Sequence, residues 1–260
     1  MPQEKTNYYS CRFDPHHYES NAYLNLGGSL VSARELSDIV QFSKIDPRSF
    51  VLDVGMGPGR VLGALASTNA TLVGIDADPR MVRYFARQRK TSSAPYKVNA
   101  HLIVASGDHL PFREEVFGAV VCIRVLRYFD QPAKAIAEMS RVLKHDGRLV
   151  MEFANMFRPQ SIIQIAGYLR ARSVYPRLFT RRTVLKWLSK NGIVVEIIRG
   201  WHRVPVEMMV SINGRIRSKI LTNLDQVLDG LFPPEFLSRS LVVSGVKTSY
   251  RLTERFDGGN

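Results

Sequence analysis

Short, mostly apolar runs recur along the middle of this chain, and turn residues bound each of them. Such continuous runs predict strands that are buried on both faces of a sheet. Five strands are expected, at residues 50–54, 71–76, 101–105, 118–123 and 147–153. Apolar residues at helical spacing occur between these runs, as they do before the first run at residues 30–42. The alternation of strand and helix predicts an α/β fold with a parallel sheet covered on both faces.

The first strand leads into the most informative segment. Asp53 lies inside the apolar run, and Gly55, Gly57 and Gly59 follow at alternate positions before a helical stretch. Glycines between a strand and a helix bring bare backbone close to a ligand at a helix N-terminus. The spacing is not the Gly-x-Gly-x-x-Gly of dinucleotide-binding turns, and a P-loop's Gly-Lys-Ser/Thr is absent. The loop therefore predicts an adenosyl cofactor other than a nicotinamide dinucleotide.

Two further acids follow later strands. Asp76 ends the second strand, 21 residues after Gly55, and Asp108 follows the third strand. An acid at the first position can accept both hydroxyls of a ribose. An acid at the second can accept a hydrogen bond from an adenine amino group.

Composition and charge bear on the expected core, the cellular location and the partner of the protein. At 260 residues, 45% hydrophobic and 23% charged, the chain is expected to fold around a sizeable core. It has two cysteines, no apolar run of membrane-spanning length and no signal-like start, which predicts a cytoplasmic protein. The net charge is +13, and residues 156–220 hold thirteen Lys and Arg against two Glu, a net +11. This segment predicts either an anionic partner (a phosphorylated small molecule, an acidic lipid surface or RNA) or simply a solvated basic surface.

Several ordered motifs together resemble the class I methyltransferases that use S-adenosylmethionine, and most closely the small-molecule, quinone-biosynthesis-like group known as methyltransferase type 11. The motifs are VLDVGMGPGR (51–60), VGIDADPRMV (73–82), GDHLPF (107–112), VVCIRVLRYFDQP (120–132) and LKHDGRLVMEF (143–153). Weaker matches at 179–198 and 239–247 fit a sixth and a seventh strand. The resemblance implies a Rossmann-like three-layer sandwich whose seven-stranded sheet is mostly parallel, with an antiparallel last strand.

The resemblance also implies a cofactor site. The cofactor would be S-adenosylmethionine, the product S-adenosylhomocysteine, and no metal is expected. Asp53 would reach the methionine amino group, Asp76 the ribose and Asp108 the adenine. The complete set of cofactor-binding residues would be Asp53, Gly55, Gly57, Gly59, Asp76, Ala77, Asp108, His109, Ile123 and Arg124.

The remaining segments are expected to serve the acceptor side. Residues 1–45 would form a helical lid, and residues 46–260 a methyltransferase domain with insertions at about 155–178 and 205–238. Tyr18 and Tyr23 would either cover the site or simply pack. Acceptor contacts are hypothesised for Tyr18, Tyr128, Arg172, Arg177 and Arg203.

The predicted function is methyl transfer, by in-line displacement, to a small-molecule or lipid-like acceptor; the basic segment leaves open whether this acceptor carries an anionic group. An RNA methyltransferase and a non-catalytic cofactor-binding scaffold remain alternatives. No catalytic residue is assigned, because an activated sulfonium asks mainly for alignment. His17, His109 and His202 are candidate bases, each with a structural alternative. Peripheral membrane contact and the oligomeric state are left open.

Overall fold

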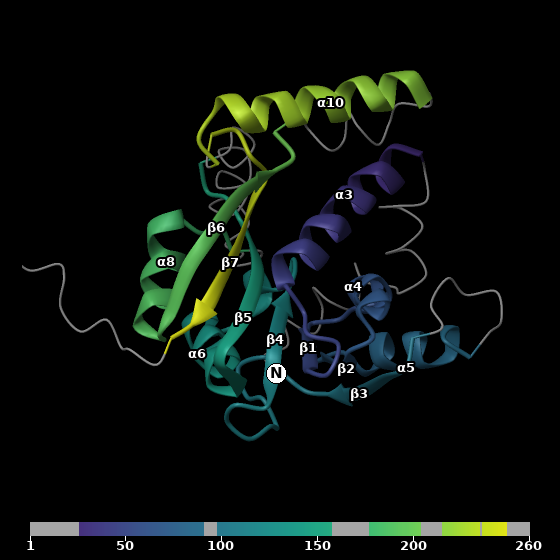
Figure 1. Cartoon of the computed structure of the whole chain (residues 1–260), viewed down its shortest axis with the longest axis vertical. Coiled ribbons are helices and arrows are strands. Elements are labelled where there is room, and N and C mark those ends of the chain that lie inside the picture. The colour runs from purple at the N-terminus through teal and green to yellow at the C-terminus, as the bar shows by residue number, and fades with distance from the viewer. Residues whose placement is uncertain (1–25, 91–97, 158–176, 204–214, 235, 249–260) are drawn as a thin grey trace, which may run out of the picture.

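The computed structural model describes residues 26–90, 98–157, 177–203, 215–234 and 236–248. Its centre is a seven-stranded sheet in the order β3-β2-β1-β4-β5-β7-β6 (Figure 1). The strands are β1 (Phe50–Val54), β2 (Thr71–Asp76), β3 (Ala100–Val104), β4 (Phe117–Cys122), β5 (Leu143–Ala154), β6 (Ile193–Trp201) and β7 (Ser240–Lys247). The pairs among β1 to β5 are parallel, and β7 runs antiparallel to both of its neighbours, β5 and β6. The predicted Rossmann-like sheet with an antiparallel last strand is confirmed.

Helices cover both faces of the sheet. They are α3 (Leu26–Ser43), α4 (Arg60–Leu65), α5 (Pro79–Gln88), α6 (Pro132–Val142), α8 (Arg181–Lys190) and α10 (Arg215–Leu231), with short 3-10 turns η1 (Ala66–Thr68) and η2 (Leu126–Tyr128). One core cluster joins the sheet to α3, α4 and α5, and the other joins it to α6 and α8. In β1, Val51 packs into the first cluster while Leu52 and Val54 pack into the second. A strand buried on both faces needs apolar residues on both, which explains the continuous runs in the sequence.

Helix starts follow the capping residues in the sequence. Asp78 accepts a hydrogen bond from the Arg80 N–H at the start of α5, where Pro79 occupies the first turn. Thr180 accepts one from the Thr183 N–H at the start of α8. These two caps are the ones that a short polar side chain before a helix predicts.

Some boundaries differ from the expectation. The strand expected at 147–153 is longer, because β5 already begins at Leu143, which pairs with Phe117 of β4. The helix α3 begins at Leu26, earlier than the apolar periodicity at 30–42 indicates. Tertiary pairing and packing override local pattern at such ends.

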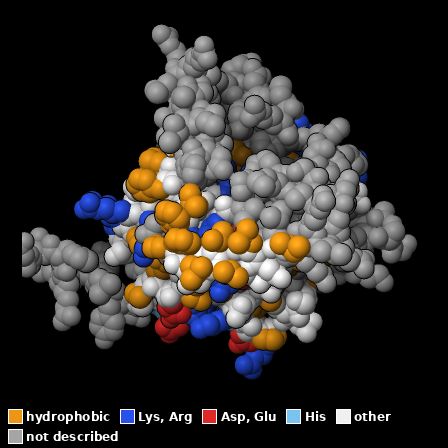
Figure 2. Space-filling model, turned by 90° about the horizontal axis from the view of Figure 1, so that it is seen from above, with side chains coloured by type: hydrophobic (Ala, Val, Ile, Leu, Met, Phe, Trp, Pro, Cys, Tyr) orange, Lys and Arg blue, Asp and Glu red, His pale blue; other side chains and the backbone are white. Residues whose placement is uncertain are grey.

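The region expected as an insertion at 205–238 contains the long helix α10, which lies above the ends of β6 and α3 in Figure 1. Figure 2 shows this end of the molecule, with a row of apolar side chains on its surface. No helix among the described residues is both long enough and apolar enough to cross a bilayer.

Candidate functional site

The glycine loop lies where β1 ends and α4 begins. Its three glycines have positive φ angles, 74° at Gly55, 53° at Gly57 and 93° at Gly59. The N–H groups of Gly55 and Met56 donate to the Ile75 carbonyl at 2.8 and 2.9 Å, which holds the loop against the end of β2. A left-handed backbone at three positions costs other residues energy, so glycine is the natural occupant.

Neighbouring side chains add a second constraint at two of these glycines. A Cβ atom at Gly55 would collide with Val125, and a Cβ atom at Gly59 would collide with the Phe85 ring of α5. Within the part of the chain that the structure describes, a Cβ atom at Gly57 would meet no heavy atom within 4 Å. The backbone of Gly57 therefore borders open space, as a loop that cradles a ligand requires.

Asp53 is the carboxylate closest in sequence to this loop, and it is 1% exposed. Among the described residues, its Oδ2 atom has no hydrogen-bond partner. Burial, with a further contribution from the charge of Asp76, raises the pKa of Asp53 to about 7, and Arg60 offsets part of the rise. A buried carboxylate oxygen without a donor fits a site for a ligand's amino group.

Asp76 closes the loop from β2. Its Oδ2 accepts the Gly57 N–H at 2.9 Å, and its Oδ1 accepts the Asp78 N–H at 2.8 Å. Burial raises the pKa of Asp76, and these two backbone hydrogen bonds oppose the rise. Each carboxylate oxygen has a further lone pair, so Asp76 can still accept hydroxyl groups from a ligand. The neighbouring Ala77 is exposed.

Asp108 lies in the loop after β3. Its Oδ1 accepts the Ser106 hydroxyl at 2.6 Å and is 3.2 Å from Nδ1 of His109. Burial opposes ionisation, but the hydrogen bonds from Ser106 and His109 outweigh it and hold the pKa of Asp108 below its ordinary value. The other ring nitrogen of His109 is 2.5 Å from Nζ of Lys134, at the surface.

The segment after β4 forms the next wall. Ile123 is buried, whereas Arg124 is half-buried with a positive φ of 64°. The Arg124 N–H donates to Oε2 of Glu152 in β5 at 2.9 Å. Tyr128, half-buried in η2, donates its N–H to the Val125 carbonyl at 2.8 Å. Because β1, β2 and β4 are parallel neighbours, the fold brings Asp53, Asp76 and Arg124 to one edge of the sheet.

A buried cluster around Glu35 of α3 supports this edge, and no motif in the sequence predicted it. Glu35 is 1% exposed; its Oε2 lies 2.9 Å from Nη1 of Arg60, its Oε1 lies 2.7 Å from Nε2 of His202, and it also pairs with the Arg124 guanidinium. Burial would raise the pKa of Glu35, but Arg60 and His202 outweigh it and lower the pKa. The cluster ties α3 to α4, to the loop after β4 and to the end of β6. The signal in the sequence is an acid at the margin of the apolar stripe of α3.

Two residues with predicted acceptor roles, Tyr18 and Arg172, lie outside the described residues, as do Tyr23 and His17. Arg177 donates to the carbonyls of Phe129 and Asp130, at 2.5 and 2.6 Å. These contacts anchor the segment after η2, so Arg177 has a structural task whatever else it does.

Arg203 and His202 are both buried, at 6% and 4% exposure. The Arg203 guanidinium donates to three carbonyls at the end of α10, those of Phe232, Pro233 and Phe236. His202 is held against Glu35 rather than presented to a ligand. An acceptor role for Arg203 stays a prediction beside this capping role.

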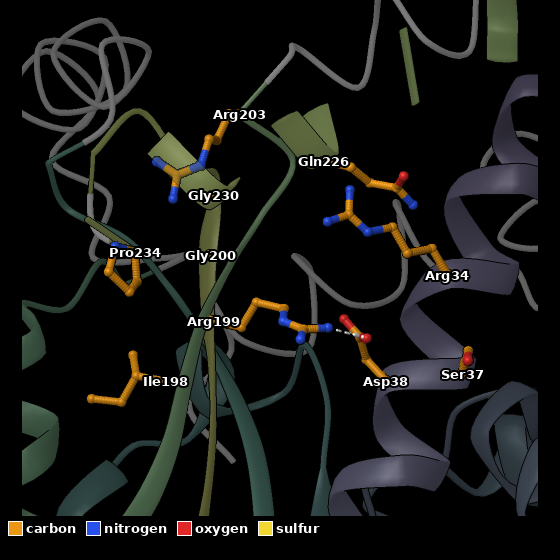
Figure 3. A pocket seen from close by; sticks show the side chains of 10 residues that line it. All are labelled: Arg34, Ser37, Asp38, Ile198, Arg199, Gly200, Arg203, Gln226, Gly230 and Pro234. Atoms are coloured by element: carbon orange, nitrogen blue, oxygen red, sulfur yellow. Dashed lines mark hydrogen bonds and ion pairs between the residues drawn. The ribbon is translucent and has the colours of Figure 1, made fainter. Parts of the chain in front are cut away.

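A cavity of about 620 Å³ lies between α3, the end of β6 and α10 (Figure 3). Three arginines line it, together with Asp38 and Gln226. Arg34 pairs with Asp225 at 2.5 Å, Arg199 pairs with Asp38 at 2.6 Å, and Arg203 holds the carbonyls described above. The charges of this cavity are therefore largely compensated within the fold.

Comparisons with known proteins agree with this geometry. Residues 52–151 match the sequence model of a family described as a methyltransferase domain. A demethylmenaquinone methyltransferase of Tropheryma whipplei is 34% identical over 155 residues, which cover 59% of this chain and 60% of that protein. The matched region thus spans about three fifths of the length of this relative.

Solved structures show the same fold. The YcgJ protein of Bacillus subtilis has a TM-score of 0.59 at 19% identity, covering 84% of this chain and 100% of that one. A geranyl diphosphate C-methyltransferase of Streptomyces coelicolor A3(2), in complex with Mg²⁺, geranyl diphosphate and S-adenosylhomocysteine, has a TM-score of 0.61 at 16% identity. It covers 83% of this chain and 80% of that one.

Proposed function

We propose that this chain, whose residues 52–151 match the model of a methyltransferase domain, transfers a methyl group from S-adenosylmethionine to a small-molecule acceptor and releases S-adenosylhomocysteine. One observation carries the proposal: the open backbone at Gly57 follows four residues after Asp53, a buried carboxylate with an oxygen that lacks a donor among the described residues. An amino acid group attached to an adenosyl unit supplies what both features require.

The residues divide between the parts of the cofactor. Asp53 would accept the methionine ammonium group in a charge-assisted hydrogen bond. Asp76 would accept the ribose hydroxyls, with Ala77 at the border of the adenine. Asp108, which is ionised because its pKa is low, would accept the adenine amino group, with His109 beside it. Ile123 and Arg124 would line the methionine side.

The chemistry that the bound cofactor supplies is an activated methyl group on a sulfonium. The chain has to orient an acceptor in line with that group and exclude water; orientation of this kind can contribute ~7–11 kcal/mol. The segment after β4 lies at the edge where such an acceptor would approach, with Tyr128 half-buried there. His109 and His202 both have protein partners in the fold, and we assign no base.

The proposed class of methyl acceptor rests on the compounds for which the related proteins are named or with which they were solved. The Tropheryma whipplei relative is named for a demethylated menaquinone, and the Streptomyces coelicolor structure holds geranyl diphosphate. The diphosphate of the second compound is anionic. A small, lipid-like acceptor with an anionic group is the class that these relatives favour for this chain. That no metal is needed stays a prediction.

Calorimetry on Asp76→Asn tests the cofactor assignment. An asparagine keeps the shape but replaces one acceptor oxygen with a donor, so it can satisfy neither both loop N–H groups nor both ribose hydroxyls. We expect the affinity for S-adenosylhomocysteine to fall by about 10- to 100-fold, as loss of charge-assisted hydrogen bonds does.

Glu114→Gln is the matched control, because Glu114 is an exposed acid outside the loop. It should leave the affinity unchanged. Equal affinity of the Asp76→Asn variant and the wild type would refute the assignment of Asp76.

A further inference from the structure

The helix α10 packs on the protein through a polar residue. Asp225 is fully buried on the side of α10 that faces α3. Its Oδ2 is 2.5 Å from Nη1 of Arg34, and its Oδ1 accepts the Arg203 N–H at 2.7 Å. The inner face of this helix is thus fixed by a buried carboxylate and its partners.

The outer face of α10 is apolar. Ile220, Leu224, Val227 and Leu231 are exposed by 59%, 45%, 57% and 68%. Their spacing of four, three and four residues places them along one face of a helix. We call these four residues the α10 stripe. Phe232 and Phe236 follow the helix and are also exposed, by 41% and 46%. Figure 2 shows apolar side chains in a row across this end of the molecule.

This arrangement inverts the usual one. A surface helix normally buries its apolar face and exposes its polar face. Here the carboxylate of Asp225 points inward, and the four aliphatic side chains of the α10 stripe point outward. Contiguous exposed apolar surface of this kind marks a site of interaction.

The charges of α10 indicate what the stripe contacts. Arg215, Arg217 and Lys219 lie among its first five residues, and no acid precedes Asp225. Cations near a helix N-terminus oppose the helix dipole, so the dipole does not account for the basic start of α10. The chain as a whole carries +13. A partner with an apolar layer beneath an anionic surface would match both the stripe and the charge.

We propose that α10 docks this protein on an anionic lipid bilayer, with the stripe at the boundary of the acyl chains and the basic start of the helix among the headgroups. An in-plane amphipathic helix binds membranes in this way. A second copy of this chain is a poorer occupant, because two chains of +13 repel each other. RNA would satisfy the charge but offers no apolar layer for the stripe. The inference concerns binding alone and does not depend on the methyl transfer proposed above.

Vesicle co-sedimentation of the full chain tests the proposal. Vesicles of phosphatidylcholine and phosphatidylglycerol in equal parts should carry the protein down, and vesicles of phosphatidylcholine alone should carry much less. The triple variant Leu224→Ser, Val227→Ser, Leu231→Ser removes exposed side chains, so its fold should persist in circular dichroism. Its partition coefficient should fall by about tenfold or more. Replacing Arg215, Arg217 and Lys219 by glutamine should weaken binding and reduce its dependence on salt.

The matched control is Phe50→Ser with Val194→Ser. These residues are also exposed, by 44% and 39%, but they lie at the beginnings of β1 and β6, away from α10. The control should bind anionic vesicles like the wild type. Failure of the wild type to bind, or equal binding by the stripe variant, would overturn the proposal. So would light scattering that shows a wild-type dimer which the stripe variant converts to a monomer, because the stripe would then belong to a second copy.

Discussion

Ionisation of the buried Asp53 carboxyl costs free energy in the folded protein, and Arg60 offsets only part of this cost. Asp53 is a buried acid whose pKa is raised from 3.8 to about 7, and one of its oxygens lacks a donor among the described residues. Groups whose ionisation is penalised in this way tend to occur where a ligand is bound. The pKa of Glu35 shifts in the opposite direction, because Arg60 and His202 outweigh the effect of burial and favour the ionised carboxylate. The two buried acids therefore differ in environment: Glu35 has cationic partners within the fold, and we propose that Asp53 receives one from a ligand.

The variant Asp53→Asn separates these roles. In the ligand-free protein, folded Asp53 keeps its proton between about pH 4 and pH 7, whereas the unfolded chain loses it. This group therefore lowers stability as pH rises through that window. We expect Asp53→Asn to gain free energy of unfolding relative to the wild type as pH rises, by on the order of 2–4 kcal/mol at about pH 8. Urea denaturation at several pH values measures the difference.

The same variant should lose cofactor affinity by about 10- to 100-fold at about pH 8, because it cannot form a charge-assisted bond to the ammonium group. The loss should shrink below pH 7, where the wild-type carboxyl takes up a proton. A variant that is less stable at every pH and binds the cofactor normally would show that Asp53 is a structural residue.

Elements differ in how far the sequence predicts them. The five strands β1 to β5 and the caps at Asp78 and Thr180 follow from local pattern, because the strands β1, β2 and β4 are buried on both faces and the capping residues act locally. The start of β5 at Leu143 and the inverted face of α10 could not be predicted this way. Each depends on a partner distant in sequence, Phe117 for the strand and Arg34 for the helix. The apolar periodicity of α10 alone would favour burial of the stripe.

The glycine loop gives a prediction at this scale. Gly57 and Gly59 both have positive φ, so alanine at either strains the backbone by ~1–2 kcal/mol. Only at Gly59 would the new Cβ also collide with Phe85, which adds ~1–3 kcal/mol of overpacking. Thermal unfolding should show that Gly59→Ala is the less stable of the two.

Gly57→Ala and Gly59→Ala should also differ in their effects on cofactor affinity. A methyl group at Gly57 projects into open space next to the loop, so Gly57→Ala should weaken binding more than its effect on stability suggests. Gly57→Ala with unchanged affinity would mean that the open space at this position is not the cofactor site.

At the scale of the whole molecule, the candidate site divides into two parts with different origins. One part is the edge of the sheet that holds Asp53, Asp76 and the residues after β4. The sequence predicts this part, because parallel strands bring these residues to one edge. The other part is the cluster around Glu35, which the sequence does not predict. This cluster joins four segments that are distant in sequence through contacts between polar side chains. The basic segment is visible in composition, but Arg177 and Arg203 turn out to hold backbone carbonyls. The net charge of a segment can indicate the kind of partner that it binds, but it does not identify the arginines that contact this partner.

The proposal that this chain binds S-adenosylmethionine is tested by calorimetric titration of the full chain with S-adenosylmethionine, S-adenosylhomocysteine and NAD in parallel. We expect S-adenosylmethionine and S-adenosylhomocysteine to bind to a single site and to compete with each other. We expect NAD not to bind, because the glycine spacing is not that of a dinucleotide-binding turn. Binding of NAD alone, or of none of the three, would refute a site for S-adenosylmethionine.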